Sequence, residues 1–173
     1  MKKLLVVVDY QNDFVSGSLG NEAAKNIEEY IASLMEEYKK NDDDILLTLD
    51  THQEDYLDTY EGKHLPVVHC IENTKGHELY GKIKDLADGY PKLRKPTFPS
   101  LELGNYLKET DYKEVTVVGV VTDICVISNA IMIKAALPNA SITIDTKGCA
   151  SNDPVQEKKA LDVMKNSLQI NVI

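Results

Sequence analysis

Residues 115–126, VTVVGVVTDICV, carry the strongest structural pattern in the sequence. It starts with an apolar run, residues 115–121, of the kind found in a strand that is buried on both faces of a sheet. From Thr122 or Asp123 the pattern becomes that of a helix, which continues to Ala136. Because parallel α/β sheets are built from buried strands that lead into helices, this stretch predicts an α/β fold.

Strand-like and helix-like segments continue to alternate on both sides of this stretch. The apolar runs 4–8 and 45–49 predict two further buried strands, and residues 21–40 carry apolar side chains at helical spacing. A long polar loop with three of the four histidines follows the second of these strands. The remaining predicted elements are strands at 92–95 and 142–144, an edge strand at 170–173, helices at 77–88 and 101–110, and a last helix with Asp153 as N-cap and Pro154 at its first position.

Length and composition describe an ordinary globular domain. The chain has 173 residues, of which 43% are hydrophobic and 27% charged. Strands and helices alternate about six times, and such alternation is typical of parallel strands joined by right-handed crossovers. We therefore predict one domain over residues 1–173, with a doubly wound (Rossmann-like) parallel sheet of about six strands and helices on both faces.

Charge, apolar run length and cysteine content argue against binding to nucleic acid or membranes and against a disulfide-stabilised secreted protein. The net charge of −9 would repel nucleic acid and an anionic membrane surface. The N-terminal apolar run, residues 4–8, is shorter than the roughly 7 to 15 residues of a signal peptide, and no run approaches the roughly 18 residues of a membrane span. Three cysteines without CxxC spacing argue against a disulfide framework. We expect a cytoplasmic protein that acts on a small molecule, with no nucleic-acid or membrane partner; a homo-oligomer stays open.

Reactive side chains follow the predicted strands at the point where each strand ends. Asp9, Asp50 and Lys95 stand at the ends of three strands, and Cys125 follows the strongest one. Ligands of open α/β sheets bind beyond the carboxyl ends of the strands, so we expect these side chains to converge there. An acid, a base and a thiol would then share one site.

Cys125 is the candidate nucleophile among the three cysteines. A thiol at a helix N-terminus is favoured as thiolate, and Lys95 would favour it further. Asp9 could accept the thiol proton if its strand neighbours the strongest one. The competing interpretations are a buried structural cysteine, a loop-capping aspartate and a solvated lysine. Cys70 and Cys149 lack such a setting and are interpreted as structural.

The loop after the second strand offers potential metal ligands. It contains Asp50, His52, Glu61, His64 and His69 within twenty residues. Carboxylate and imidazole together suit a borderline divalent metal. The alternative is a solvated polar loop.

Three motifs, in order along the chain, resemble those of the isochorismatase-like cysteine hydrolases, and among these the nicotinamidases. DYQNDF is similar to the opening motif and KPTF to the lysine motif, so the resemblance implies that Asp9 and Lys95 are catalytic. GVVTDICV is similar to the nucleophile motif and implies Cys125 as nucleophile. The resemblance further implies a cis peptide between Val120 and Val121, and an oxyanion hole formed by the backbone N–H groups of Val121 and Cys125.

DTH, followed by the histidine of VVHC, resembles the nicotinamidase metal site. This implies a divalent metal held by Asp50, His52 and His69, with zinc favoured over iron or manganese. Glu61 stands where some members use a fourth ligand, and whether it or His64 also binds the metal stays open. In the same family, residues at the positions of Phe14 and Phe98 contact the substrate ring.

The implied reaction is hydrolysis of nicotinamide to nicotinate and ammonia through a thioester. Asp9 would take the thiol proton and return it to the leaving ammonia, and a water activated by Asp9 or by the metal would release the acid. The alternatives are another amide or ureido hydrolase of the same superfamily and a metal-binding protein of the same fold without turnover.

Overall fold

A sheet of six parallel strands forms the centre of the structure, a computed structural model that describes residues 2–173. The strands are β1 (Leu4–Val8), β2 (Asp44–Asp50), β3 (Lys92–Lys95), β4 (Glu114–Val120), β5 (Ser141–Ala150) and β6 (Asn171–Val172). Their order across the sheet is β3-β2-β1-β4-β5-β6, and every pairing is parallel. The prediction of a doubly wound α/β fold is confirmed.

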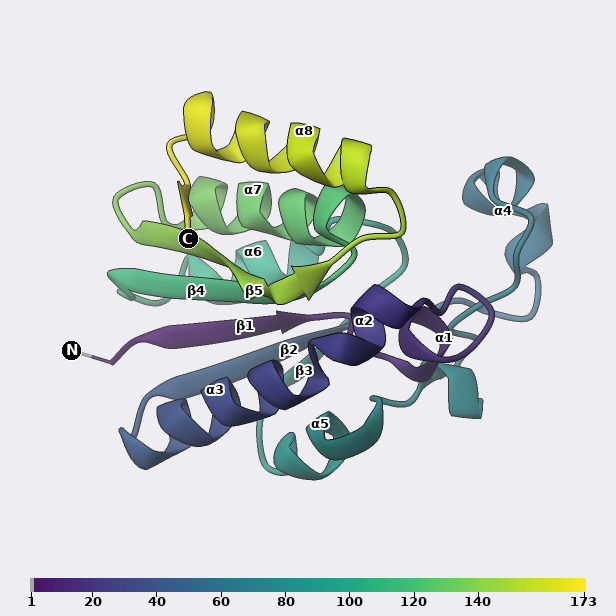
Figure 1. Ribbon diagram of the computed structural model, residues 1–173, viewed down its shortest axis with the longest axis horizontal. Coiled ribbons are helices and arrows are strands. Elements are labelled where there is room, and N and C mark those ends of the chain that lie inside the picture. The colour runs from purple at the N-terminus through teal and green to yellow at the C-terminus, as the bar shows by residue number, and fades with distance from the viewer. Residues whose placement is uncertain (1) are drawn as a thin grey trace.

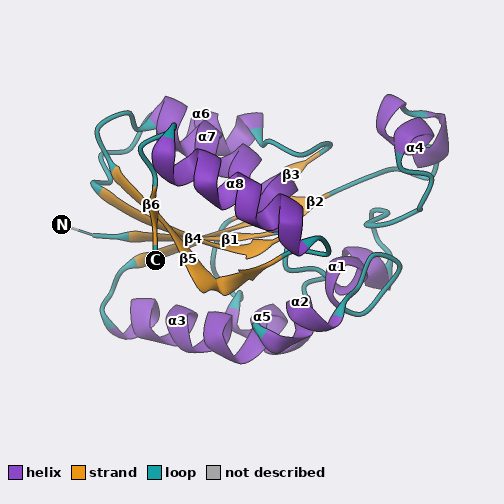
Figure 2. Cartoon of the chain, turned by 45° about the horizontal axis from the view of Figure 1, so that its top comes forward, coloured by secondary structure: helices purple, strands orange, loops and turns teal. Residues whose placement is uncertain are grey.

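Helices cover both faces of this sheet. The helices of the structure are α1 (Asn12–Val15), α2 (Glu22–Asn26), α3 (Glu28–Lys40), α4 (Tyr60–His64), α5 (Gly81–Leu86), α6 (Leu101–Leu107), α7 (Ile127–Ala136) and α8 (Pro154–Asn166), with 3₁₀ turns η1 (Tyr56–Asp58) and η2 (Lys75–His77) and a π-helical turn η3 (Thr122–Val126). Figure 2 shows α3 and α5 below the sheet and α6, α7 and α8 above it. None of these helices is long and apolar enough to span a bilayer.

The central strand β1 explains the two-layer core. It lies between β2 and β4, and all five of its residues are buried. Because successive side chains of a strand point to opposite faces, Leu5 and Val7 pack with the α3 and α5 side. Leu4, Val6 and Val8 pack with the side of α6, α7 and α8. This is why the sequence of β1 is continuously apolar rather than alternating.

Several element boundaries differ from the sequence-based prediction. The helix expected at 21–40 is divided at Ile27 into α2 and α3, and η2 and α5 occupy the place of the helix expected from His77. The loop after β2 contains η1 and α4. Strand β5 was predicted at 142–144 but continues to Ala150, because its pairing with β4 resumes after a register shift between Val117 and Gly119. The polar segment Asp145–Gly148 gives no strand pattern in the sequence, so the extension was not predicted.

Gly119 is required where β4 approaches β1. Its φ is +123°, a region that side chains rarely adopt, and a Cβ there would overlap the carbonyl oxygen of Val8. The carboxyl end of β4 is thereby held against that of β1. The peptide bond between Val120 and Val121 that follows is cis, which confirms the expectation from the motif.

The last helix begins as predicted, and its cap can be tested. Asp153 accepts hydrogen bonds from the backbone N–H groups of Val155 and Gln156, with Pro154 at the first helical position. Replacing Asp153 by Ala leaves those donors without the side-chain acceptor, so we expect the free energy of unfolding to fall by about 1 kcal/mol. Denaturant unfolding of both proteins measures this difference, and an unchanged free energy would contradict the capping role.

Candidate active site

The ends of β1, β3 and β4 bring Asp9, Lys95 and Cys125 together at the carboxyl edge of the sheet. The Lys95 ammonium nitrogen lies 2.6 Å from Asp9 Oδ2 and 3.5 Å from Cys125 Sγ. All three side chains are buried, and Lys95 is only 1% exposed. The predicted convergence of an acid, a base and a thiol is therefore present in the fold.

Asp9 is held in place by its own backbone and by β2. Its φ of +48° places it in the left-handed region, which aspartate tolerates better than most residues, and turns the chain away from the sheet. Its N–H donates to the carbonyl oxygen of Thr48, and the Thr48 hydroxyl donates to Asp9 Oδ1 at 2.7 Å. The other carboxylate oxygen is thus left facing Lys95.

The electrostatic balance at Cys125 differs from the expectation of a ready thiolate. Burial raises the pKa of the Cys125 thiol well above its usual value, and the Lys95 ammonium opposes this without reversing it. Burial also raises the pKa of the Asp9 carboxyl. Cys125 moreover lies in the π-helical turn η3 rather than at the first turn of a regular α-helix. The neutral thiol is therefore the resting form, and a base must take its proton.

Lys95 remains charged despite its burial. Burial by itself lowers its pKa, but the nearby groups Asp9, Cys125 and Asp50 outweigh burial and raise the pKa well above its usual value. Its ammonium group also donates to Asp50 Oδ1 at 3.1 Å and to the carbonyl oxygen of Thr97 at 3.0 Å. Lys95 therefore links the thiol to the neighbouring cluster of histidines.

Asp50, His52 and His69 form that cluster, with one ligand atom from each lying within 4.8 Å of the others. Asp50 Oδ2 is 2.9 Å from His52 Nε2 and 3.4 Å from His69 Nε2. His69 Nδ1 lies 2.7 Å from the carbonyl oxygen of Val67, a contact that orients the ring with Nε2 toward Asp50. Although burial raises the pKa of Asp50, hydrogen bonds from the two histidines and the charge of Lys95 hold it below its usual range.

The donor chemistry of this cluster fits a divalent metal ion. Glu61 adds a second carboxylate, with Oε1 at 3.6 Å from His52 Nε2 and 3.9 Å from His69 Nε2. A divalent metal binds imidazole in its neutral form, so as a ligand set the two carboxylates and two imidazoles would carry two negative charges, which the cation neutralises. Mixed nitrogen and oxygen ligands of this kind suit Zn, Fe or Mn better than Ca.

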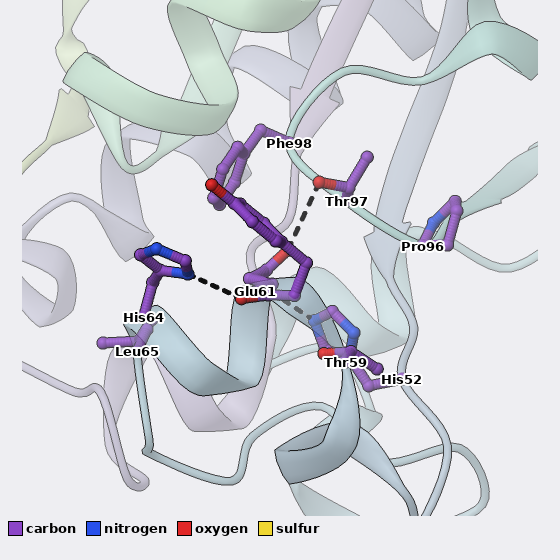
Figure 3. A pocket seen from close by; sticks show the side chains of 9 residues that line it. His52, Thr59, Glu61, His64, Leu65, Pro96, Thr97 and Phe98 are labelled. Carbon is purple, nitrogen blue, oxygen red and sulfur yellow. Dashed lines mark hydrogen bonds and ion pairs between the residues drawn. The ribbon is translucent and has the colours of Figure 1, made fainter.

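Glu61 and His64 have different positions although both belong to α4. Figure 3 shows Glu61 directed toward His52, and the Thr97 hydroxyl donates to its Oε2 at 3.2 Å. The exposed His64 lies on the opposite side of Glu61, with Nδ1 2.8 Å from the carbonyl oxygen of Tyr60. Of the two residues, only Glu61 approaches the histidine cluster.

A small cavity joins the thiol to the histidine cluster. It has a volume of about 140 Å³, and Cys125, Asp50 and His69 all line it. The predicted ring-contacting residues Phe14 and Phe98 line it as well, and Phe14 packs edge-on against His69 with ring centroids 5.5 Å apart. The other lining residues are Leu19, Glu61, Leu65, Val121, Ile124 and Asn152. Among the thiols of residues 2–173, Cys125 alone borders this space.

A second cavity, of about 380 Å³, shares Glu61, Leu65 and Phe98 with the smaller one as a common wall, and Figure 3 shows the side chains that line this larger cavity. His52 borders this larger cavity, whereas His69 and Asp50 border the smaller one. The histidine cluster therefore stands between the two spaces. Figure 1 shows α4, which carries part of this wall, projecting beyond the carboxyl ends of the strands.

Several residues that support the site are not among those predicted from the sequence. Gln11 is fully buried, and its side chain bonds both the N–H and the carbonyl oxygen of Asp50. The fully buried Asn129 bonds the carbonyl oxygen of Cys125. Gln11 lies inside the DYQNDF motif, so its position in the sequence already indicated a role in the site. Nothing in the local sequence pattern indicates such a role for Asn129 or for the cavity residue Asn152.

Comparisons with known proteins agree with this arrangement. A family model described as the isochorismatase domain matches residues 3–172. PncA of Bacillus subtilis, an isochorismatase family protein, is 36% identical over 143 residues, which cover 76% of this chain and 78% of that protein.

Solved structures are similar over almost the whole chain. The crystal structure of the nicotinamidase/pyrazinamidase PncA from Bacillus subtilis has a TM-score of 0.88 at 31% identity and covers 99% of both chains. The pyrazinamidase of Pyrococcus horikoshii, solved in complex with zinc, has a TM-score of 0.86 at 25% identity, covering 100% of this chain and 99% of that one. Together with the family model, these likenesses show that this chain belongs to the isochorismatase family.

Proposed function

We propose that this protein is a metal-containing nicotinamidase, which hydrolyses nicotinamide to nicotinate and ammonia through a thioester on Cys125. The observation that carries the proposal is the cavity of about 140 Å³, which places Cys125 in one wall and two members of the histidine cluster, Asp50 and His69, in another. Relatives named nicotinamidase support the same activity. Residues 1–173 act as one hydrolase domain.

The first half of the reaction uses Asp9, Lys95 and Cys125. Asp9 accepts the thiol proton, and the Lys95 ammonium stabilises the resulting thiolate at 3.5 Å. The sulfur attacks the amide carbon, and the backbone N–H groups of Val121 and Cys125 stabilise the oxyanion. Asp9 then returns the proton to the leaving nitrogen, the carbon–nitrogen bond breaks and ammonia departs.

The second half hydrolyses the thioester. Asp9, again ionised, takes a proton from a water molecule that attacks the thioester carbon. The carbon–sulfur bond breaks, nicotinate is released, and the thiol of Cys125 regains its proton from Asp9. The position of Asp9 between Thr48 and Lys95 suits both steps, because the threonine hydroxyl fixes Oδ1 while Oδ2 faces the Lys95 ammonium, which itself lies 3.5 Å from the sulfur.

Asp50, His52 and His69 would hold the divalent ion, with Glu61 as a further ligand either directly or through water. Zinc is favoured, and the structure of a pyrazinamidase relative in complex with zinc supports this choice. When bound, the ion supplies a Lewis-acidic contact for the lone pair of the pyridine nitrogen. Lys95 contributes to the same cluster through its bond to Asp50.

The size of the cavity favours a small aromatic amide. Its volume of about 140 Å³ is well below the roughly 300 to 1,000 Å³ of pockets for drug-sized ligands. Phe14 and Phe98 supply apolar ring surface, against which a single aromatic ring can pack. A substrate must present a carbonyl to Cys125 and a lone pair to the histidine cluster at once. Pyridine-3-carboxamide does this across one rigid ring.

Substrate selectivity follows from this requirement. Nicotinamide and pyrazinamide both carry the ring nitrogen and should release ammonia. Benzamide has the same shape without that nitrogen, so a polar partner at the cluster stays unpaired, a loss of about 1 to 3 kcal/mol. We expect kcat/KM for benzamide to be lower by about ten- to a hundredfold, as measured by ammonia release.

The same assay separates nicotinamidase from the other amide hydrolases of this fold. An N-carbamoyl amino acid is included in the substrate panel at equal concentration. Equal turnover of benzamide and nicotinamide would contradict the proposed role of the ring nitrogen. Rapid hydrolysis of the N-carbamoyl compound without ammonia from nicotinamide would assign the protein to the ureido hydrolases instead.

A further inference from the structure

Asn129 is a buried amide that the mechanism above does not use. It lies in α7, four residues after Cys125, and is 0% exposed. Its Nδ2 donates to the carbonyl oxygen of Cys125 at 2.8 Å and to that of Phe98 at 3.1 Å. Its Oδ1 accepts a hydrogen bond from the backbone N–H of Ser100 at 2.9 Å. One side chain therefore bonds three backbone groups.

These bonds join the two segments that carry the thiol and the ammonium. Cys125 belongs to η3, whereas Phe98 and Ser100 belong to the loop that follows Lys95 at the end of β3. Lys95 is tied to the same loop, because its ammonium donates to the carbonyl oxygen of Thr97 at 3.0 Å. Lys95 Nζ and Cys125 Sγ are 3.5 Å apart, and the hydrogen bonds of Asn129 hold the two segments that carry them together.

A carboxamide is the only uncharged side-chain group that can donate two hydrogen bonds from one atom and accept a third on another. Asparagine offers two donors on one nitrogen together with an acceptor oxygen, and its short stem matches the four-residue spacing to Cys125. Its neighbours along the segment, Val126, Ala130 and Ile133, are fully buried apolar residues. An apolar residue at position 129 would leave the Ser100 N–H and the carbonyl oxygens of Phe98 and Cys125 without this side-chain partner. The amide therefore keeps the loop after Lys95 bonded to the Cys125 turn.

We propose that Asn129 is a positioning residue for the reaction, holding the Cys125 turn and the Lys95–Ser100 loop at the spacing that thiol activation requires. This inference rests on the proposed function. Asn129 acts through Cys125, Lys95 and Phe98 and does not itself line the cavity of about 140 Å³.

The variants differ in which of the three bonds they retain. Asn129→Asp keeps the acceptor for Ser100 and loses both donors. Asn129→Thr keeps a hydroxyl that can bond the carbonyl oxygen four residues earlier, that of Cys125, and loses the bonds to the loop. Because small displacements of reacting groups cost up to about a hundredfold, we expect kcat to fall about ten- to a hundredfold in Asn129→Asp and about three- to tenfold in Asn129→Thr. KM should change less than kcat in both.

A second measurement does not depend on the substrate. The rate at which iodoacetamide alkylates Cys125 is measured against pH in the metal-loaded protein, by peptide mapping. With Lys95 less well placed against the sulfur, the alkylation profile of Asn129→Thr should shift to higher pH. In Asn129→Asp the added carboxylate raises the thiol pKa by itself, so Asn129→Thr is the variant that decides in this measurement. A wild-type protein that releases no ammonia from nicotinamide would refute the proposed function, while this profile would still decide the role of Asn129.

Tyr38→Phe is the matched control. It removes one side-chain hydrogen bond, from Tyr38 to Thr116 at 2.8 Å, on the opposite face of the sheet from α7. Circular dichroism and Tm verify folding, and all rates are measured well below the lowest Tm. Unchanged kcat and alkylation profiles in the Asn129 variants would overturn the proposal, as would equal losses in Tyr38→Phe. If Asn129→Asp does not fold, Asn129→Thr decides by the same criteria.

Discussion

Cys125→Ala should leave a folded protein without measurable turnover of nicotinamide. Removing a covalent nucleophile costs enzymes about 10⁴-fold or more in kcat, because the remaining groups cannot replace the bond that it forms. The fold should persist, since Cys125 stands beside a cavity and its replacement removes a single sulfur atom. Ammonia release measures the activity, and circular dichroism together with Tm measures the fold.

The other two thiols provide matched controls for this experiment. Cys70 and Cys149 are buried, and burial raises the pKa of both thiols. Neither borders the small cavity, so Cys70→Ala and Cys149→Ala should retain turnover. In the wild type, stoichiometric iodoacetamide should label Cys125 first and abolish activity. Preferential labelling of either other cysteine with activity retained would refute the assignment of the nucleophile.

His52→Ala should deprive the protein of its metal ion and of most of its activity. Protein purified without chelator should contain close to one divalent ion per chain, because Asp50, His52 and His69 can share one ion. Loss of an imidazole ligand leaves an incomplete set of donors, and changes in the outer shell alone cost about ten- to a hundredfold. We therefore expect kcat/KM to fall by about a hundredfold or more. Elemental analysis and the ammonia assay measure the two effects.

His64→Ala is the matched control for the metal experiment. His64 lies in the same loop but faces the larger cavity, on the far side of Glu61 from His52. This variant should keep both its metal ion and its activity. Loss of metal from His64→Ala would add this residue to the ligand set, and full activity of metal-free wild-type protein would reduce the histidine cluster to a structural feature.

Local patterns in the sequence predicted the class of fold and most of the candidate site residues. The apolar runs of β1 and β4 identify strands buried on both faces, because only such strands lack a polar side. The Asp153 cap was readable because capping depends on residues adjacent along the chain. Asp9, Lys95 and Cys125 could be named because the ends of parallel strands must meet at one edge of the sheet.

The distances within the site and its supporting contacts depend on how the elements pack in three dimensions. The register shift that prolongs β5 depends on its pairing with β4, and the buried state of Cys125 that raises its thiol pKa depends on the surrounding elements. Likewise, Asn129 is an ordinary polar residue in the sequence and becomes a connection between two segments only when η3 and the loop after β3 pack together. Hydrogen bonds and desolvation act between atoms that are close in space, and a pattern along the chain records proximity only among neighbours within a strand or a helical turn.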